Sequence, residues 1–525
     1  MARTQHQYSQ TKTADIPRSS FDLSHGLKTT LESSQLVPIL SLEVLPGDTI
    51  NCKASLFGRL ATPIKPFMDN VFMETFFFFT PWRQVWPNFT KMMGEQDAPG
   101  DSIEYSVPII SGGNGNVTEQ SISDYLGIPI GATLNAGILP VNALPFRCYN
   151  KIFNYWFRDE NLVAPVPEIT SDGPDNLANN YSIKSRRKRR DYITSSLPFP
   201  QKGPDVTIDF AITGNVITDA PDGTVVTIDD STTGLPHSLN AQINPAQVQK
   251  GTQEGTANSP LYIDGGESAI TINSLRESFQ IQKLLERDAR GGTRYPEILQ
   301  SHFRVNDPSL LVHQRPLYLG GGSSMVNINP VQQSSGTAEP DGYTPTPQGN
   351  LSAYGTVSGR NHGFTASFTE HGHVMGIVNF RADLTYQQGL ERYWTRQTRY
   401  DFYWPALSHL GEQATKNSEV FVSNNIAIDN DTFGYMPRYD EYRSKQSQIT
   451  GLFRSDATAS LDVWHLAQDF TALPALDEAF ITDAVPMDRV VAVPSEPDWL
   501  LDVYFKIRAA RPLPLYATPG LIDHF

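Results

Sequence analysis

The sequence predicts a mainly β protein of the sandwich or jelly-roll type, and three observations carry this prediction. The 525 residues include 38 glycines and 38 prolines, aromatic residues make up 10% of the chain and charged residues 18%. This mixture is typical of strands joined by long loops. Strand-like runs occur near the N-terminus, and a regularly alternating run lies near the C-terminus. Pairing between such distant segments is typical of β-sandwiches and jelly rolls.

Residues 1–20 are predicted to form a flexible arm, because they are polar and rich in Gln, Thr and Ser, with a mildly basic character from Arg3, Lys12 and Arg18. No signal peptide is expected, since the segment lacks an apolar region. No apolar run in the chain approaches the ~20 residues that span a bilayer. The two cysteines, Cys52 and Cys148, exclude a disulfide framework and favour a reducing compartment.

The stretch FMETFFFFTPWRQVW, residues 72–86, predicts a strand that is covered on both faces. Phe77 and Phe79 share one face, while Phe76 and Phe78 share the other, and both faces are largely apolar. One cover is the core of the domain, and the second is either another layer of the same chain or a neighbouring subunit. The candidate core or interface aromatics are Phe76, Phe77, Phe78, Phe79, Trp82 and Trp86.

Three segments predict helices. The run 121–127, SISDYLG, predicts a short helix stopped by glycine. In 145–162, the spacing of Phe146, Tyr149, Phe153 and Trp156 is helical, and a proline occupies the first turn. A third helix is expected to begin at Ser274 with a capping-box pattern and to end at the glycine pair 291–292.

Two segments are predicted to be surface insertions in a single domain that covers residues 21–525. Residues 203–266 are dominated by Thr, Asn, Gly, Asp and Pro, with short alternating runs at 206–212 and 224–230. Such a composition adds little to a core. A smaller insertion is expected at 327–355.

The last clear strand covers 500–508, LLDVYFKIR. Its strict alternation predicts that Leu501, Val503, Phe505 and Ile507 face inward, and that Asp502, Tyr504, Lys506 and Arg508 face outward.

Signals for catalysis or for a metal site are weak, and neither a catalytic residue, a metal ligand nor a cofactor is expected. The sequence EHGH places Glu370, His371 and His373 close together, but no further ligand with suitable spacing follows. The glycine run 320–322 lacks the Lys and Ser/Thr of a phosphate loop. No GxSxG motif occurs.

The strongest charge signal is the run KSRRKRRDY, in a chain whose net charge is −15. An acidic chain is not expected to bind nucleic acid over its whole surface, so such binding needs a local basic patch. The functional interpretation is phosphate binding, and the alternative is a solvated loop or an ion-pair cluster. The candidate DNA-contact residues are Lys184, Arg186, Arg187, Lys188, Arg189 and Arg190, with Arg3 and Lys12 from the arm.

An ordered set of motifs resembles the major capsid proteins of gokushoviruses, single-stranded DNA bacteriophages of the microvirus group. The set spans most of the chain and includes RSSFDLSHGLKTT (18–30), RLATPIKPFMDN (59–70), LPFRCYNKIFNYWFRDENL (144–162), DYITSSLPFPQKG (191–203), FQIQKLLERDARGGTRYPEILQSHF (279–303), RPLYLGG (315–321), TYQQGLER (385–392), SLDVWHLAQDF (460–470) and PGLIDHF (519–525).

The resemblance implies an eight-stranded antiparallel jelly roll with long inserted loops and a few short helices. It implies a T=1 icosahedral shell of sixty copies around circular single-stranded DNA, assembled in the bacterial host cytoplasm. Residues 203–266 lie where the family has an insertion at the threefold axes that is used for host attachment. Implied partners are a small basic DNA-binding phage protein, a scaffolding protein and a host surface receptor. The alternative function is a β-sandwich phage spike that binds a glycan or receptor, and a β-rich hydrolase is a further rival.

Overall fold

A computed structural model describes residues 17–111, 116–135, 137–206, 272–305, 315–336 and 346–516, with the backbone of five short strands between 216 and 263. The predicted contacts of Arg3 and Lys12, and the short alternating run 206–212 except for its first residue, lie outside these residues. The chain divides into two compact units, one formed by 1–200 and 291–525 and the other by 201–290.

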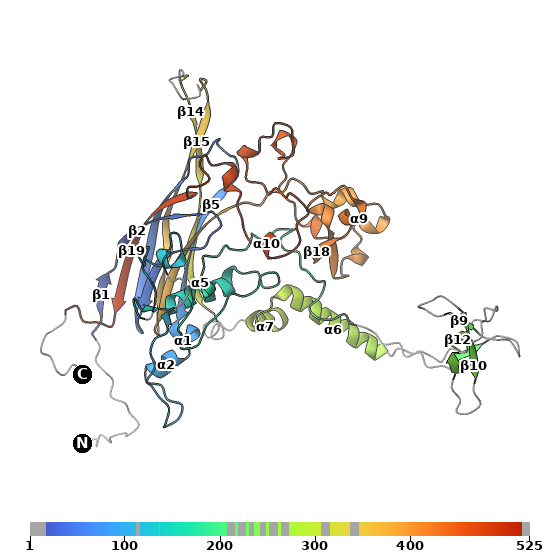
Figure 1. Ribbon diagram of the computed structural model, residues 1–525, viewed down its shortest axis with the longest axis horizontal. Coiled ribbons are helices and arrows are strands. Elements are labelled where there is room, and N and C mark those ends of the chain that lie inside the picture. Colours follow the sequence, from blue (N-terminus) through green and yellow to red (C-terminus); the bar gives the residue numbers. More distant parts are fainter. Residues whose placement is uncertain are drawn as a thin grey trace, which may run out of the picture. The chain divides into compact units, whose positions relative to one another are not determined.

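The first unit is built around an antiparallel sheet of ten strands that curls on itself (Figure 1). Its path runs β1-β19-β4-β15-β13-β5-β16-β3, with β2 paired to β19 and β14 paired to β15. This architecture confirms the predicted mainly β, jelly-roll type of fold. The strands are β1 (Ser19–Asp22), β2 (His25–Leu31), β3 (Val37–Val44), β4 (Thr49–Leu60), β5 (Val71–Pro81), β13 (Leu317–Met325), β14 (Asn327–Gln332), β15 (Leu351–Ser367), β16 (Gly372–Ala382) and β19 (Trp499–Arg511).

The two ends of the sequence meet in this sheet. β1 and β2 both pair with β19, and β19 pairs along its other edge with β4. The predicted alternation of the last strand is confirmed, because Leu501, Val503, Phe505 and Ile507 are at most 3% exposed while the residues between them are exposed. Pairing between the first and the last strands was predicted and is confirmed.

The curl is accompanied by irregularities at glycines. The registers shift between Tyr318 and Gly320, between Gly359 and His362, and between Gly376 and Ile377, and such bulges bend strands. The glycine run of β13 permits close backbone approach, because a Cβ at Gly321 would lie 2.0 Å from the Thr75 carbonyl oxygen. The run 320–322 therefore serves sheet packing.

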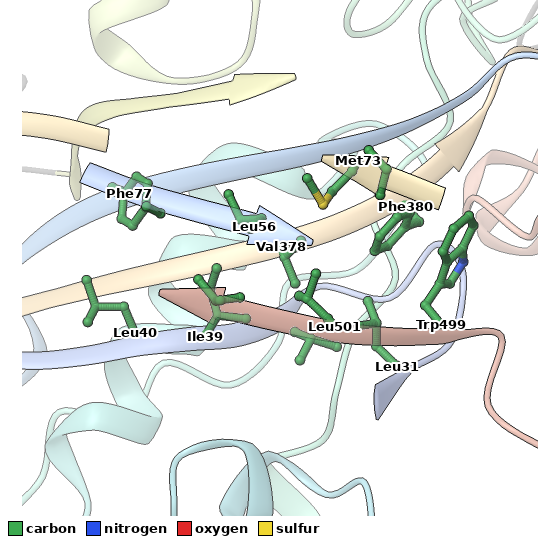
Figure 2. Packing of buried hydrophobic residues seen from close by; sticks show 14 of the residues in the cluster. Leu31, Ile39, Leu40, Leu56, Met73, Phe77, Val378, Phe380, Trp499 and Leu501 are labelled. Atoms are coloured by element: carbon green, nitrogen blue, oxygen red, sulfur yellow. The ribbon is translucent and has the colours of Figure 1, made fainter. Parts of the chain in front are cut away.

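The interior of the curl holds the largest apolar cluster. Figure 2 shows Leu31 of β2, Leu40 of β3, Met73 and Phe77 of β5 and Val378 of β16 in this cluster. Other members come from the inward rows of β4 and β19, whose exposure alternates along each strand. The rings of Phe380 and Trp499 stack with centroids 3.9 Å apart, and this contact links β16 to the first residue of β19.

A second layer follows β5 in the chain and supplies its own apolar cluster. The predicted helix in 145–162 is present as α4, which continues into a π-helical turn, η1, so its apolar spacing shifts after Ile152. The predicted short helix is α3, followed by Gly127 at φ +91°. The elements are α1 (Trp82–Val85), α2 (Asn88–Met92), β6 (Ile109–Ile110), α3 (Ile122–Tyr125), β7 (Val141–Asn142), α4 (Leu144–Ile152), η1 (Phe153–Phe157) and α5 (Leu177–Asn180).

The segment between β16 and β19 forms a third region with a small apolar cluster of its own. It contains a two-stranded sheet and many short turns of 3-10 helix. Its elements are η2 (Arg392–Thr395), η3 (Arg399–Asp401), η4 (Pro405–Leu407), β17 (Glu412–Lys416), η5 (Asn417–Glu419), α9 (Ile426–Asp429), β18 (Thr432–Pro437), η6 (Asp440–Tyr442), η7 (Gly451–Phe453), η8 (Asp462–Trp464), α10 (Glu478–Ile481) and η9 (Met487–Arg489). The first unit also contains α7 (Tyr295–Phe303).

The second unit contains most of the predicted large insertion. Its strands β9, β10 and β11 form one small sheet, and β8 and β12 form another. The predicted third helix is α6 (Ile272–Gly291), which begins two residues before the predicted start, so Ser274 lies within its first turn. Phe279 is 64% exposed, so the apolar stripe of α6 is largely uncovered within this unit. The strands are β8 (Val216–Thr218), β9 (Thr227–Asp229), β10 (Pro236–Ala241), β11 (Val248–Lys250) and β12 (Leu261–Ile263).

The smaller predicted insertion, 327–355, differs in form from a loop. Its two ends are strands, because β14 pairs with the first part of β15 from Asn327–Thr356 to Gln332–Leu351. The described ends of the segment therefore form two paired strands that extend the main sheet (Figure 1).

Candidate functional site

The aromatic strand β5 separates two cores of the same chain. Phe77 and Phe79 belong to the cluster inside the curl, where their rings lie 5.4 Å from Phe364 and 4.6 Å from Phe368. Phe78 points into the second layer and is 1% exposed, with its ring 5.8 Å from that of Phe157. The cover on the second face thus comes from this chain, one of the two alternatives that the sequence left open.

The two tryptophans that follow β5 are also internal. Trp82 is 4% exposed and Trp86 is fully buried. The Trp86 indole N–H donates a hydrogen bond of 2.7 Å to the Asp172 carboxylate. Of the six candidate aromatics, Phe76 alone is only partly buried, and it packs against the second layer. The structure therefore places all six within the packing of a single subunit.

The basic run 184–190 lies along the second layer. Some of its charged side chains form ion pairs within the subunit. The Arg186 guanidinium donates to the Glu74 carboxylate of β5 and lies 5.6 Å from the Phe76 ring. Arg381 donates to the same carboxylate at 2.7 Å. Burial by itself would raise the pKa of Glu74, but these two guanidinium groups outweigh it and lower that pKa. Arg186 thus compensates a partly buried carboxylate on the aromatic strand.

Two further members of the run are also engaged internally. Arg187 pairs with Asp159 at 3.4 Å. Lys188 is 4% exposed, its backbone N–H donates to the Ile481 carbonyl at 2.7 Å, and its ammonium lies 4.6 Å from the Phe480 ring centroid. Burial lowers the pKa of Lys188 to about 8, although Asp483 nearby favours the charged form. These contacts correspond to the ion-pair interpretation of the run.

The remaining members are more accessible. The Arg189 side chain is 61% exposed and lies 3.5 Å from Asp383, Arg190 is exposed, and Lys184 is partly exposed. The backbone of Lys184 is fixed, because its N–H donates to the Tyr149 hydroxyl at 2.9 Å and its carbonyl accepts from Leu36 at 2.8 Å. Lys184, Arg189 and Arg190 are the members whose charge can reach solvent.

The three polar side chains of the EHGH segment, Glu370, His371 and His373, each contact a different partner. Glu370 accepts two hydrogen bonds from Arg83, at 2.6 and 3.1 Å. His371 packs edge-on against Phe89. His373 lies in β16, a strand that is buried along its whole length, and its ring is 3.2 Å from the Ser41 hydroxyl. Burial lowers the pKa of His373 to about 4. Within the described residues, no group of three His, Cys, Asp or Glu side chains could hold a metal ion.

Sequence reasoning missed a buried ion pair in the second layer. Arg147 of α4 makes two hydrogen bonds with Asp175, at 2.8 and 2.7 Å, and the two side chains are 1% and 0% exposed. The Arg147 guanidinium also donates to the Val85 and Ser171 carbonyls, and the Tyr181 hydroxyl donates to Asp175 at 2.6 Å. An arginine inside the apolar helical pattern of 145–162 was the available signal.

A second group of cations lies on the outward side of the main sheet, where β4 and β19 pair. The exposed row of β4 includes Lys53, Phe57 and Arg59, and the exposed row of β19 includes Tyr504, Lys506 and Arg508. The outward positions of β19 were predicted. Their proximity to the cations of β4 depends on the pairing of strands from opposite ends of the sequence.

These features define a β protein of the jelly-roll type, with a curled antiparallel sheet and a second layer that covers the aromatic strand. Jelly-roll folds of this kind occur in viral capsid proteins, lectin domains and cupins. Residues 9–521 match the family model described as "Capsid protein (F protein)". The chain belongs to this family of phage capsid proteins.

Relatives with the same function match along nearly their whole length. The chain is 42% identical to the capsid protein VP1 of Bdellovibrio phage phiMH2K, covering 99% of this chain and 98% of that one. It is 40% identical to VP1 of Chlamydia phage 1, with 98% of each chain covered. It is 33% identical to VP1 of Spiroplasma virus 4, with 98% and 97% covered. The resemblance to gokushovirus-type capsid proteins is confirmed, and the protein is a structural component of a virion, not an enzyme.

The chain was not expected to span a membrane. Among the described residues, no helix combines the length and the apolar character needed to cross a bilayer.

Proposed function

We propose that sixty copies of this chain form a T=1 icosahedral shell around a circular single-stranded DNA genome. The observation that carries the proposal is the match to the capsid family over residues 9–521. A physical observation supports it, because both faces of β5 are covered by the chain itself. The aromatic strand is therefore covered without a neighbouring copy, and the subunit can fold before it assembles.

The copy number tests the proposed shell directly. Native mass spectrometry of purified particles, with the nucleic acid removed, should give a protein mass that corresponds to sixty chains of 58.3 kDa. A mass that corresponds to another closed number of copies would reject the T=1 arrangement while leaving the capsid function intact.

The insertion 203–266 is proposed to project at the threefold axes and to take part in attachment to a host surface receptor. Its place within a separate compact unit, 201–290, supports this proposal. Replacing residues 203–266 by a short Gly/Ser linker should leave the first unit folded and should abolish adsorption of virions to host cells. Insoluble subunits, or unchanged adsorption, would contradict the proposal. The matched control is a virion with the same linker inserted after Gly100, a glycine with open space around it.

The genome is proposed to contact the accessible part of the basic run, Lys184, Arg189 and Arg190, with help from Arg3 and Lys12 of the arm. Arg186, Arg187 and Lys188 are proposed to act as braces inside the subunit, because their charged groups already have partners there. A small basic DNA-binding phage protein and a scaffolding protein are proposed as further partners during assembly in the host cytoplasm. Virions with Arg189→Gln and Arg190→Gln should retain their shell, and normal packaged DNA content would count against this contact.

A further inference from the structure

The outward side of the main sheet carries a group of six side chains that we call the cationic sheet face. It consists of Lys53, Phe57, Arg59, Tyr504, Lys506 and Arg508, all exposed and all on the paired strands β4 and β19. Cross-strand partners share a face of a sheet and lie about 5 Å apart. Four cations thus lie along one exposed face of two paired strands, in a chain whose net charge is −15.

The register places two of these cations against each other. Lys53 and Lys506 are direct Cα partners across the β4–β19 ladder. Like charges in this position repel and destabilise the pair. Arg508 lies two residues further along β19 and adds to the same field. This arrangement costs stability in the free subunit, and a bound anion would remove the cost.

Two carboxylates, Asp22 and Asp502, lie beside these cations and offset only part of their charge. Within the part of the chain that the structure describes, no salt bridge involves Lys53, Arg59, Lys506 or Arg508. Asp22 faces Arg508 in the register and accepts hydrogen bonds from Ser24, and these bonds together with the nearby Arg508 and Lys506 cations lower the pKa of its carboxyl group. Asp502 lies 3.5 Å from the Lys28 ammonium. The contrast with the basic run is clear, because Arg186 and Arg187 are paired with carboxylates inside the subunit.

Two aromatic rings lie among the cations. Phe57 is 52% exposed and Tyr504 is 54% exposed, whereas apolar residues on the inward side of the same strands are at most 3% exposed. Phe57 is the partner of Asp502, so it lies diagonally across the ladder from Tyr504. Exposed rings on a sheet, surrounded by cations, are the arrangement on which unpaired bases stack while phosphates contact Lys and Arg.

We propose that the cationic sheet face binds single-stranded DNA without sequence preference. Lys53, Lys506, Arg508 and Arg59 contact phosphates, and Phe57 and Tyr504 stack on bases. The proposal deepens the proposed enclosure of a DNA genome and rests on it for the biological ligand. An acidic surface of a neighbouring copy is the alternative occupant. Exposed stacking rings between unpaired cations favour the nucleic acid, because carboxylates would need only the cations.

The test measures binding of a fluorescently labelled oligothymidylate to the full-length, unassembled subunit by fluorescence anisotropy over a series of salt concentrations. The variant Lys53→Gln/Lys506→Gln should weaken binding, and the slope of log affinity against log salt should become shallower by about 0.7 for each phosphate that the variant no longer neutralises. The matched control is Arg443→Gln/Lys445→Gln, which removes two exposed cations from another region. The control should bind like the unmodified chain.

Replacing the aromatic rings is expected to change the affinity without changing its salt dependence. Phe57→Ala and Tyr504→Ala should each weaken binding by about fivefold or more at fixed salt, because each removes the stacking of one base, while the salt slope stays unchanged. Both residues are exposed, so the variants should fold, and thermal unfolding checks this. The lysine variant should unfold no more easily than the unmodified chain, since it removes a repulsion.

Two results would overturn the proposal. One is unchanged affinity and salt slope in Lys53→Gln/Lys506→Gln. The other is unchanged DNA binding together with loss of shell formation, which would make this face a contact between copies. The binding assay uses unassembled subunits, so a copy number other than sixty would reject the proposed shell without affecting this result.

Discussion

Replacing Arg147 by alanine is expected to lower the free energy of unfolding of the subunit by about 3–5 kcal/mol, because it leaves the Asp175 carboxylate buried without its partner. Both side chains are almost completely buried, and the pair connects α4 to the loop that contains Asp175 and to Val85 at the end of α1. Chemical denaturation of the unassembled subunit, followed by tryptophan fluorescence, measures the change. Trp86 lies in the same layer and reports on it.

The matched control is Lys28→Ala, which breaks an exposed ion pair, in contrast to the buried Arg147–Asp175 pair. Lys28 and Asp502 are 3.5 Å apart, and their side chains are 82% and 54% exposed. Water and salt screen such a pair, so its loss should cost no more than about 1 kcal/mol. Equal effects of the two substitutions would show that the Arg147–Asp175 pair does not hold the second layer together.

Phe78→Ala is expected to destabilise the unassembled subunit by about 3–5 kcal/mol, since it removes a large buried side chain and leaves a cavity. The Phe78 ring contacts Trp156, Phe157 and Tyr318, with centroids 5.5, 5.8 and 5.5 Å away. These residues come from the π-helical turn and from β13. The substitution should therefore loosen the second layer from the sheet, and the same denaturation experiment measures it.

Phe57→Ala is the control for this substitution, because Phe57 also lies on a long strand of the sheet but is 52% exposed. Its replacement should change the free energy of unfolding by less than about 1 kcal/mol. If Phe78→Ala behaves like Phe57→Ala in denaturation but prevents shell formation, then Phe78 acts in a contact between subunits and not in the core.

The sequence pattern predicted much of the fold where it depends on local periodicity. The two faces of β5 and the inward row of β19 follow directly from alternation, since successive side chains of a strand point to opposite sides. The helix at 145–162 was predicted from its spacing, but the change to a π-helical turn at Phe153 was not, because it depends on packing against β5. Ordered motifs predicted the capsid family.

Pairing of the first strands with the last was predicted, but the individual side-chain partners that come from distant segments were beyond the sequence pattern. For the run 184–190 the sequence left phosphate binding and an ion-pair cluster both open. The partners of Arg186 and Arg187 are Glu74 and Asp159, whose positions only the folded chain reveals. The cationic sheet face has the same origin. Lys53 and Lys506 come from opposite ends of the sequence and become neighbours only through the register of β4 with β19.

Electron microscopy of the purified full-length chain, expressed with its phage partners, tests the central claim most directly. A capsid subunit should give uniform, closed icosahedral particles. Small open oligomers of defined size, with no closed shells under any assembly condition, would contradict the capsid function and would favour a receptor-binding spike.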